Sequence, residues 1–223
     1  MPLILPFAGL RPVPERANDV VAPPYDVLNS EEARERASGR PLSFLHISKA
    51  EIDLPEGTDP YDPAVYAKAA ENLNKLVADG VLKREDKPVY YVYRLTMGEH
   101  VQTGLVAAAS VADYDINRIR KHEFTRPAKE DDRVRQIEAL NAQTGPVLLA
   151  YRSQDDIDAL IASVTVNPPE YDLVADDGIG HAFWVVDDQA TIDKLTEGFE
   201  AMEAIFIADG HHRSASASRV AAS

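Results

Sequence analysis

The sequence predicts an α/β or α+β protein with a mixed sheet and short helices. Short apolar runs typical of strands alternate with amphipathic helical stretches along the chain. Two pairs of these runs are separated by glycine-containing turns, which is the signal of a β-hairpin. A last apolar run, near residue 205, passes through Gly210 into a stretch of small residues that suits the start of a helix.

Residues 1–112 are expected to form an N-terminal extension. Pro23 and Pro24 bias the backbone toward extended conformations, so we expect a stiff loop. This loop is either a plain surface connector or a support that presents Tyr25 and Asp26 to a cleft. Periodicity, capping and turn residues predict the other elements: a short strand at 20–22, a helix over 31–37 capped by Ser30, a strand at 43–48, a helix from Pro63 to Gly80, and a hairpin of strands 89–95 and 102–111 around Gly98.

Residues 113–223 are expected to form a second segment that carries the functional residues. The same patterns predict a helix from 127 or 128 to about 142, a buried strand at 147–151, a helix over 155–164, a hairpin of strands 171–175 and 181–186, a helix capped by Asp187 or Asp188 that runs to about 202, and the final strand and helix. Residues 215–222 look helical but end without a capping or turn signal. We therefore expect this chain to be the N-terminal portion of a longer protein.

Composition and charge restrict the class of function. The net charge is −14, so we expect no direct binding to nucleic acid. The chain contains no cysteine, which excludes disulfides, a thiol nucleophile and cysteine-based metal sites. It shows neither a signal peptide nor an apolar run of membrane-spanning length. We expect a cytoplasmic protein that has no membrane partner.

The sequence around Gly210 predicts a phosphate-binding turn. Strand, glycine turn and helix start form a common anion site, because the amides of the first helical turn point toward the ligand. His211, His212 and Arg213 follow the glycine, and arginine is a bidentate ligand of phosphate. The alternative is an ordinary strand end with His-His-Arg on the surface.

Three groups of residues could cooperate in chemistry: Asp209–Ser214, the pair His122-Glu123 with Thr125, and Asp132-Arg133. Carboxylates, imidazoles, an arginine and an anion-binding turn suit phosphoryl transfer, which depends on positioning and charge neutralisation. Asp209 could hold Mg²⁺ together with phosphates. A metal-only site is weaker, because His211 and His212 are adjacent and point apart. A serine hydrolase is weaker still, because no Gly-x-Ser-x-Gly motif is present.

The run Asp209-Gly210-His211-His212-Arg213 resembles the Asp-Gly-His-His-Arg motif of the ParB/sulfiredoxin-like superfamily, in particular its free-serine kinase branch. In those kinases a His-Glu pair lies upstream, before a helix and a strand, and its Glu is the catalytic base. The resemblance therefore implies that Glu123, with His122, holds this role. It also implies a ParB/sulfiredoxin-like core. The chain departs from the kinases by inserting a helix, a hairpin and another helix between Leu149 and Ile205.

The whole chain is similar to the bacterial and archaeal family called "domain of unknown function ten-fifteen", whose members are often labelled ParB-like. The markers are Val21–Val27, Ser43–His46, His122-Glu123-x-Thr125 and Asp209–Arg213. The label does not establish a function, since a shared fold and loop do not fix the chemistry.

These observations lead to three alternatives. The first is a nucleotide-dependent kinase of a small hydroxyl-bearing metabolite such as serine, with ADP or ATP, ahead of CTP, as donor. In it Arg213, His211, His212 and the amides near Gly210 and Ser214 hold phosphate, Asp209 places Mg²⁺, and Glu123 takes the hydroxyl proton. The second is a ParB-like nucleotide-binding switch without phosphotransfer. The third is an inactive descendant that keeps the loop as a turn. An oligomer is compatible with each.

Overall fold

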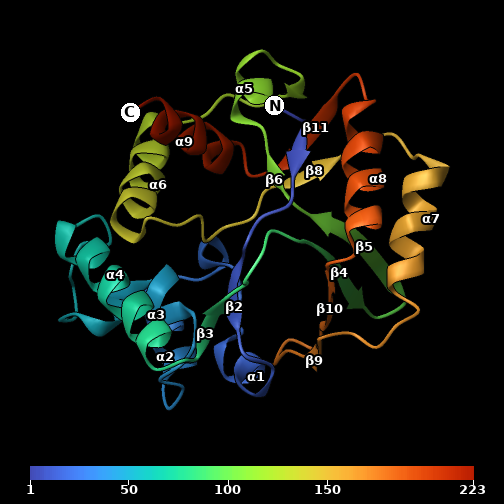
Figure 1. The fold of residues 1–223 in the computed structure, drawn as a ribbon. Helices are drawn as coiled ribbons and strands as arrows, with labels where there is room; N and C mark the ends of the chain where they lie inside the picture. Colours follow the sequence, from blue (N-terminus) through green and yellow to red (C-terminus); the bar gives the residue numbers. More distant parts are fainter. The chain divides into compact units, whose positions relative to one another are not determined.

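The structure is a computed structural model that describes residues 1–223, and it has a mixed α+β fold (Figure 1). The fold class expected from the sequence is confirmed. The chain forms two compact units that interleave along the sequence: residues 1–18, 83–120 and 150–206 make the first, and residues 19–82, 121–149 and 207–223 make the second. The division into residues 1–112 and 113–223 concerns the sequence alone and stays a prediction.

The first unit is built on a four-stranded antiparallel sheet in the order β5-β4-β10-β9. Both predicted hairpins are confirmed: β4 (Tyr90–Met97) with β5 (His100–Val106), and β9 (Tyr171–Val174) with β10 (Gly180–Val186). Strands β4 and β10 join the two hairpins, with Val92 opposite Trp184. The buried apolar side chains lie at the start of β4 (Tyr90, Tyr91 and Val92) and at the end of β10 (Trp184 and Val186), so the core of this unit packs there.

Two helices accompany this sheet, α7 (Asp155–Val164) and α8 (Gln189–Glu200), and they lie side by side (Figure 1). Asp188 caps α8, as one of the two predicted alternatives. The α8 side chain of Leu195 is fully buried, and the Thr196 hydroxyl lies 2.7 Å from the hydroxyl of Tyr90 on β4. The smaller elements of the unit are β1 (Ile4–Leu5), β2 (Leu10–Pro12), a 3-10 turn (Pro14–Arg16), β6 (Ala108–Ala109), α5 (Val111–Asp115) and β7 (Ile119–Arg120).

The second unit is mainly helical. Helix α6 (Pro127–Leu140) packs between α4 (Pro63–Ala78) and α9 (His211–Ala222), and α9 lies along α6 in Figure 1. Helix α3 (Leu45–Ser48) contacts α4, and α2 (Ser30–Ala37) packs on α3 through a cluster that includes Ala33 and Leu45. Two 3-10 turns, Tyr25–Val27 and Ala50–Asp53, complete this part. Two short elements lie where the chain passes from one unit to the other: α1 (Ala17–Val20) and β3 (Leu82–Arg84).

Strand β11 (Ile205–Asp209) carries the chain to the predicted turn. It is the central strand in the order β7-β11-β8, with β8 spanning Leu148–Ala150. Its pairing with β7 is parallel, and Ile205 lies opposite Ile119. Ile205 and Ile207 are almost completely buried. The alternating buried side chains hold the strand in place, so the position of its last residue, Asp209, is fixed by packing.

Several local predictions are wrong. Residues 43–48 do not form a strand, because α3 covers Leu45–Ser48. A short apolar run suits either structure, and here the buried contacts of Leu45 with neighbouring helices favour a helical turn. Residues 20–22 are not a strand either: α1 ends at Val20, and Pro23 and Pro24 follow at once.

Two further predictions need correction. Strand β8 is shorter than expected and is not buried throughout, because it lies at a sheet edge and Leu148 remains 48% exposed. The cap of α2 is Asn29 instead of Ser30. The Asn29 side chain accepts from the Glu32 amide, and the Glu32 carboxylate accepts from the Asn29 amide, so the two residues form a capping box.

None of the helices combines the length and the apolar character that a lipid bilayer requires of a spanning segment.

Candidate phosphate-binding site

The turn at Gly210 has the predicted strand–glycine–helix geometry. Strand β11 ends at Asp209, Gly210 has a φ of +96°, and α9 begins at His211. A side chain at position 210 would be strained by this φ. Its Cβ would also lie 3.2 Å from Val147 Cγ2 and 3.3 Å from Arg213 Cζ. Glycine is therefore required both by the backbone conformation and by close neighbours.

The first turn of α9 presents backbone amides without a capping side chain. No side chain accepts a hydrogen bond at the Gly210 cap position. The first amide that bonds within the helix is that of Ser214, which donates to the Gly210 carbonyl over 2.9 Å. The amides of residues 211–213 come before this bond, and first-turn amides lack intrahelical acceptors. This arrangement has the geometry of the anion site that the sequence predicts.

The two histidines attach the segment 121–126 to the start of α9. The Nε2 atom of His211 accepts from the backbone amide of His122 over 3.4 Å. The Nε2 atom of His212 accepts from the backbone amide of Arg126 over 3.1 Å. The rings of His122 and His211 also meet edge to face, with centroids 4.4 Å apart. The side chains of His211 and His212 therefore fix the loop that carries Glu123.

Glu123 lies beside the turn, as the resemblance implies. Its Oε2 atom is 3.6 Å from Nδ1 of His211. Since Nε2 of His211 accepts a hydrogen bond, the neutral ring carries its proton on Nδ1, which faces this carboxylate. Burial first, and then the charge of His122, lower the pKa of His211, so the ring is neutral at pH 7. Glu123 remains 58% exposed and accessible to a ligand.

Arg213 connects the turn to the loop before β8. Its Nη2 atom donates to Oδ2 of Asp209 over 2.5 Å, and its Nη1 atom donates to the carbonyl of Pro146. The side chain is only 17% exposed, whereas that of Asp209 is 71% exposed. Two of the Arg213 N–H groups therefore hold the turn. A guanidinium has five N–H groups, so donors remain for a ligand.

The described residues contain no group of three or more His, Asp or Glu side chains arranged to hold a metal ion. Asp209 offers one carboxylate, and Arg213 already bonds one of its oxygens. This set fits a Mg²⁺ ion that is held mainly by phosphate oxygens, and it does not fit an ion held by the protein alone.

The other predicted residues lie on α6 or, in the case of Thr125, just before it in the same unit. The Thr125 hydroxyl donates to Glu130, and Glu130 also pairs with Arg219 of α9 over 3.1 Å. Asp132 pairs with Arg133 and accepts from the hydroxyl of Tyr66 over 2.8 Å. Ser214 is placed at the turn, but both its amide and its hydroxyl donate to the Gly210 carbonyl.

Sequence reasoning missed two partners of the site, the amide of Arg126 and the carbonyl of Pro146. Both are backbone atoms, which every residue carries, so residue identity gives no signal for them. Gly145 offered a weak one. A Cβ at that position would lie 3.1 Å from Arg213 Cδ, so the close approach of Arg213 depends on a glycine there.

The fold and the site together define an α+β protein with a glycine turn at a helix start and a carboxylate beside it. A family model described as "Protein of unknown function (DUF1015)" matches residues 4–223, and the chain belongs to this family. Searches among curated proteins and among solved structures returned no match.

Proposed function

We propose that the turn at Gly210 binds the phosphates of a nucleotide and that the protein transfers a phosphoryl group to a small hydroxyl-bearing metabolite. One observation carries this proposal: the Glu123 carboxylate lies 3.6 Å from His211, the first residue of a helix that no side chain caps. A proton acceptor and an anion site thus meet in one place, although they are far apart in the sequence.

The phosphates would bind to the amides of residues 211–213 and to the remaining N–H groups of Arg213. Anions are favoured at helix N-termini by the aligned peptide dipoles and the unpaired amides. The net charge of −14 makes such a local site important, because the rest of the surface repels anions. ADP or ATP is the proposed donor, ahead of CTP.

In the transfer step, the hydroxyl oxygen of the acceptor attacks the terminal phosphorus. The bond between that phosphorus and its bridging oxygen breaks, and the electron pair stays with the departing nucleotide, which has one phosphate fewer. Glu123 accepts the hydroxyl proton as general base. Mg²⁺ would supply charge neutralisation, with Asp209 as its protein ligand.

His211 and His212 are positioning residues in this proposal. Their rings hold the backbone at both ends of the segment that carries Glu123. Catalytic groups must be held closely to their productive geometry, and hydrogen bonds from behind are the usual means. The pair His122-Glu123 then acts through Glu123, while His122 supports His211 by ring contact.

Nucleotide binding is tested first, by thermal denaturation with ADP, ATP, CTP and GTP in the presence of Mg²⁺. A ligand that binds only the folded protein raises the midpoint. We expect a rise with ADP or ATP that is reduced in Arg213→Ala. The absence of any nucleotide effect on the wild-type protein would refute the proposed donor site.

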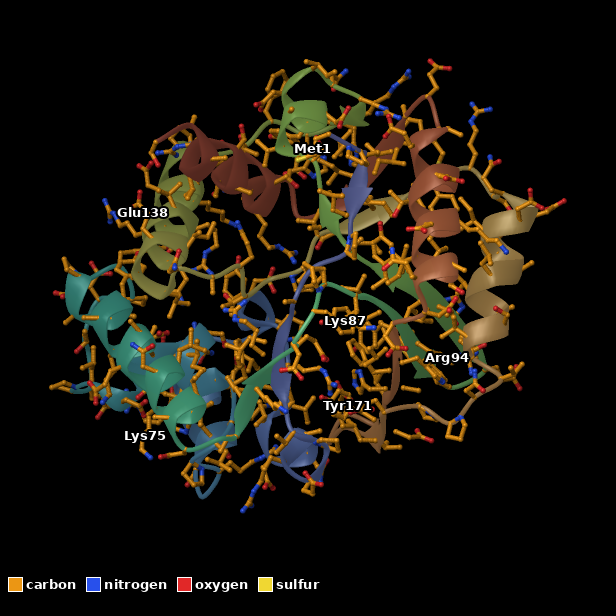
Figure 2. The ribbon with its side chains drawn as sticks, in the orientation of Figure 1. Met1, Lys75, Lys87, Arg94, Glu138 and Tyr171 are labelled. Atoms are coloured by element: carbon orange, nitrogen blue, oxygen red, sulfur yellow. The ribbon has the colours of Figure 1, made fainter.

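Phosphotransfer is tested by following phosphoester formation from L-serine and other small alcohols. Glu123→Gln should lower turnover by about 10²–10⁴-fold while the nucleotide-induced rise in midpoint persists. The matched control is Glu138→Gln, because Glu138 is an exposed carboxylate on α6 of the same unit (Figure 2). Equal turnover of Glu123→Gln and wild type would remove Glu123 from the mechanism.

A second candidate is a nucleotide-binding switch without phosphotransfer. In it Phe124, which is 98% exposed directly beside Glu123, would contact a partner protein. In this case a nucleotide would bind, no phosphoester would form with any acceptor, and Phe124→Ser would abolish capture of the partner.

A further inference from the structure

The second unit contains a small cavity beside the Gly210 turn, and the proposed phosphate site does not use it. Its volume is about 30 Å³. It opens between the 3-10 turn at Tyr25, the end of α3, helix α6, the loop at 143–145 and the start of α9. The polar side chains that line it are Tyr25, Ser48, Arg133, Gln136, Gln143, Thr144 and Arg213. Tyr25 belongs to the Pro-Pro-Tyr loop. The sequence allowed two interpretations of this loop, a plain surface connector or a support that presents Tyr25 to a cleft.

Two arginines, Arg133 and Arg213, line this cavity, and no Asp or Glu side chain does. Each arginine is paired with a carboxylate outside the lining, Arg133 with Asp132 and Arg213 with Asp209, so the cavity offers charged N–H donors and no excess of positive charge. Charged donors form strong hydrogen bonds to carboxylate and phosphate. Charge alone does not define the ligand, so the geometry of each donor matters.

Arg133 is held in a fixed orientation. Its guanidinium lies over the ring of Tyr25, 4.1 Å from the centroid. Its Nε and Nη2 atoms donate to Oδ2 of Asp132 over 2.9 and 2.6 Å. These bonds use two of the five N–H groups, and the others can bind a ligand.

The partner carboxylate of Arg133 is itself held from behind. The hydroxyl of Tyr66 donates to the other oxygen of Asp132 over 2.8 Å. Burial and this hydrogen bond raise the pKa of Tyr66 to about 12, so the hydroxyl keeps its proton. The orientation of Arg133 is therefore set before a ligand arrives, which lowers the entropic cost of binding.

Ser48 gives independent evidence for a ligand. Its hydroxyl is buried and has no hydrogen-bond partner in the structure, and it lies on the wall of the cavity. Buried polar atoms are nearly always paired, so an unpaired hydroxyl at a cavity indicates a missing acceptor or water. The phenol of Tyr25 is a second donor, because burial raises its pKa and keeps it protonated at neutral pH.

The cavity has room for a small polar group, because its volume of about 30 Å³ exceeds the roughly 10–15 Å³ that one water needs. We infer that this cavity binds the carboxylate of the acceptor, which is then a small hydroxy acid. This inference rests on the proposed function. Arg213 borders both the cavity and Gly210, so an acceptor bound here would lie next to the proposed phosphate site.

Two matched pairs of probes test the inference: glycolate against ethylene glycol, and glycerate against glycerol. Each pair differs by a carboxylate in place of a CH₂OH group. Binding is measured by calorimetry or ligand-observed NMR on the full chain. We expect the acids to bind with millimolar or lower Kd and the alcohols not to bind. Equal binding of acid and alcohol, or no binding of either acid, would overturn the inference and leave the cavity as a site for water only.

Variants locate the binding. Arg133→Met should weaken binding of the acids at least tenfold, while the control Lys129→Met, an exposed cation on the same helix outside the cavity, should not. Ser48→Ala loses no hydrogen bond within the protein, so it should fold normally and weaken binding by about 3- to 10-fold. Ser48→Ala therefore tests the cavity even if Arg133→Met does not fold. Acid binding that neither Arg133→Met nor Ser48→Ala changes would place the acid elsewhere.

The nucleotide measurement separates this inference from the proposed function. If the acids bind as expected and no nucleotide raises the denaturation midpoint, the cavity stands and the phosphotransfer proposal fails. If ADP or ATP binds and the acids do not, the nucleotide site stands and the carboxylate cavity fails. Arg133→Met should keep the nucleotide effect of the wild-type protein, because Arg133 is not part of the turn.

Discussion

The imidazole of His212 accepts a hydrogen bond from the backbone amide of Arg126, with 3.1 Å between the two nitrogens. The preceding histidine, His211, accepts from the amide of His122 in the same way. Two adjacent side chains of α9 thus hold both ends of the segment that carries Glu123. Adjacent histidines that point apart chelate one ion poorly, but they are well suited to holding two separate points of a loop.

Replacement of His212 should loosen this segment. His212→Ala removes the acceptor of the Arg126 amide, and a hydrogen bond of this kind contributes about 0.5–1.5 kcal/mol. We expect the Arg126 amide to exchange with solvent about 3- to 10-fold faster in hydrogen-exchange measurements. His100→Ala, at an exposed position of the β4–β5 hairpin in the other unit, serves as control. Unchanged protection at Arg126 would show that the imidazole does not hold the loop.

Gly210 should tolerate alanine less well than other glycines with positive φ. Gly57 has a φ of +85°, and no atom lies within 4 Å of the position that a Cβ would occupy there, so Gly57→Ala should cost about 1–2 kcal/mol through the backbone alone. Gly210→Ala adds close contacts with Val147 and Arg213, and we expect about 1–3 kcal/mol more. Urea denaturation of both variants gives the difference. Equal losses would mean that the turn relaxes without cost.

Stability should depend on pH through His211. Burial lowers the pKa of His211 most, and the neighbouring His122 and His212 lower it further. Glu123 and Asp209 act in the opposite direction, but the net effect is a lowered pKa. Because the folded pKa lies below the unfolded value of 6.5, the unfolded chain binds more protons in acid. This contribution is therefore fully present above pH 6.5 and is lost as the pH falls.

The measurement is the urea midpoint between pH 5.5 and 7.5, compared with that of His211→Gln. We expect the wild-type midpoint to fall more steeply toward acid than that of the variant, since glutamine does not titrate. If the two curves run parallel, His211 is not the group responsible.

Close packing of α6 and α9 should depend on the small residue at position 216. Ser216 is fully buried, and its hydroxyl donates to the carbonyls of His212 and Glu130 over 2.7 and 3.2 Å. Ser216→Leu has no space, so we expect a loss of about 1–3 kcal/mol in the free energy of unfolding. Ala221→Leu, at an exposed position of the same helix, is the control. A stable Ser216→Leu variant would mean that the two helices can move apart freely.

Much of the fold could be predicted because the signals are local. The hairpins around Gly98 and Asp177-Gly178, helix α7 and the strand–glycine–helix turn follow from periodicity and turn residues. Residues 43–48 failed because a short apolar run suits a strand or a helix equally, and contacts with α2 and α4 decided between them. The prediction that β8 is buried was wrong because its edge position depends on the order of strands in the sheet, which no local pattern gives.

Local sequence patterns alone predict the elements around Gly210 and the residue types available for chemistry, because glycine, arginine and carboxylates carry their conformational and chemical properties wherever they lie. The partners of these groups follow from the folded arrangement. It brought Glu123 to His211 and turned both histidines onto backbone amides, and it placed Tyr25, Ser48 and Arg133 around one cavity. Those partners include backbone atoms and residues far apart in the chain, and they come together only when the apolar faces of the helices are buried against each other.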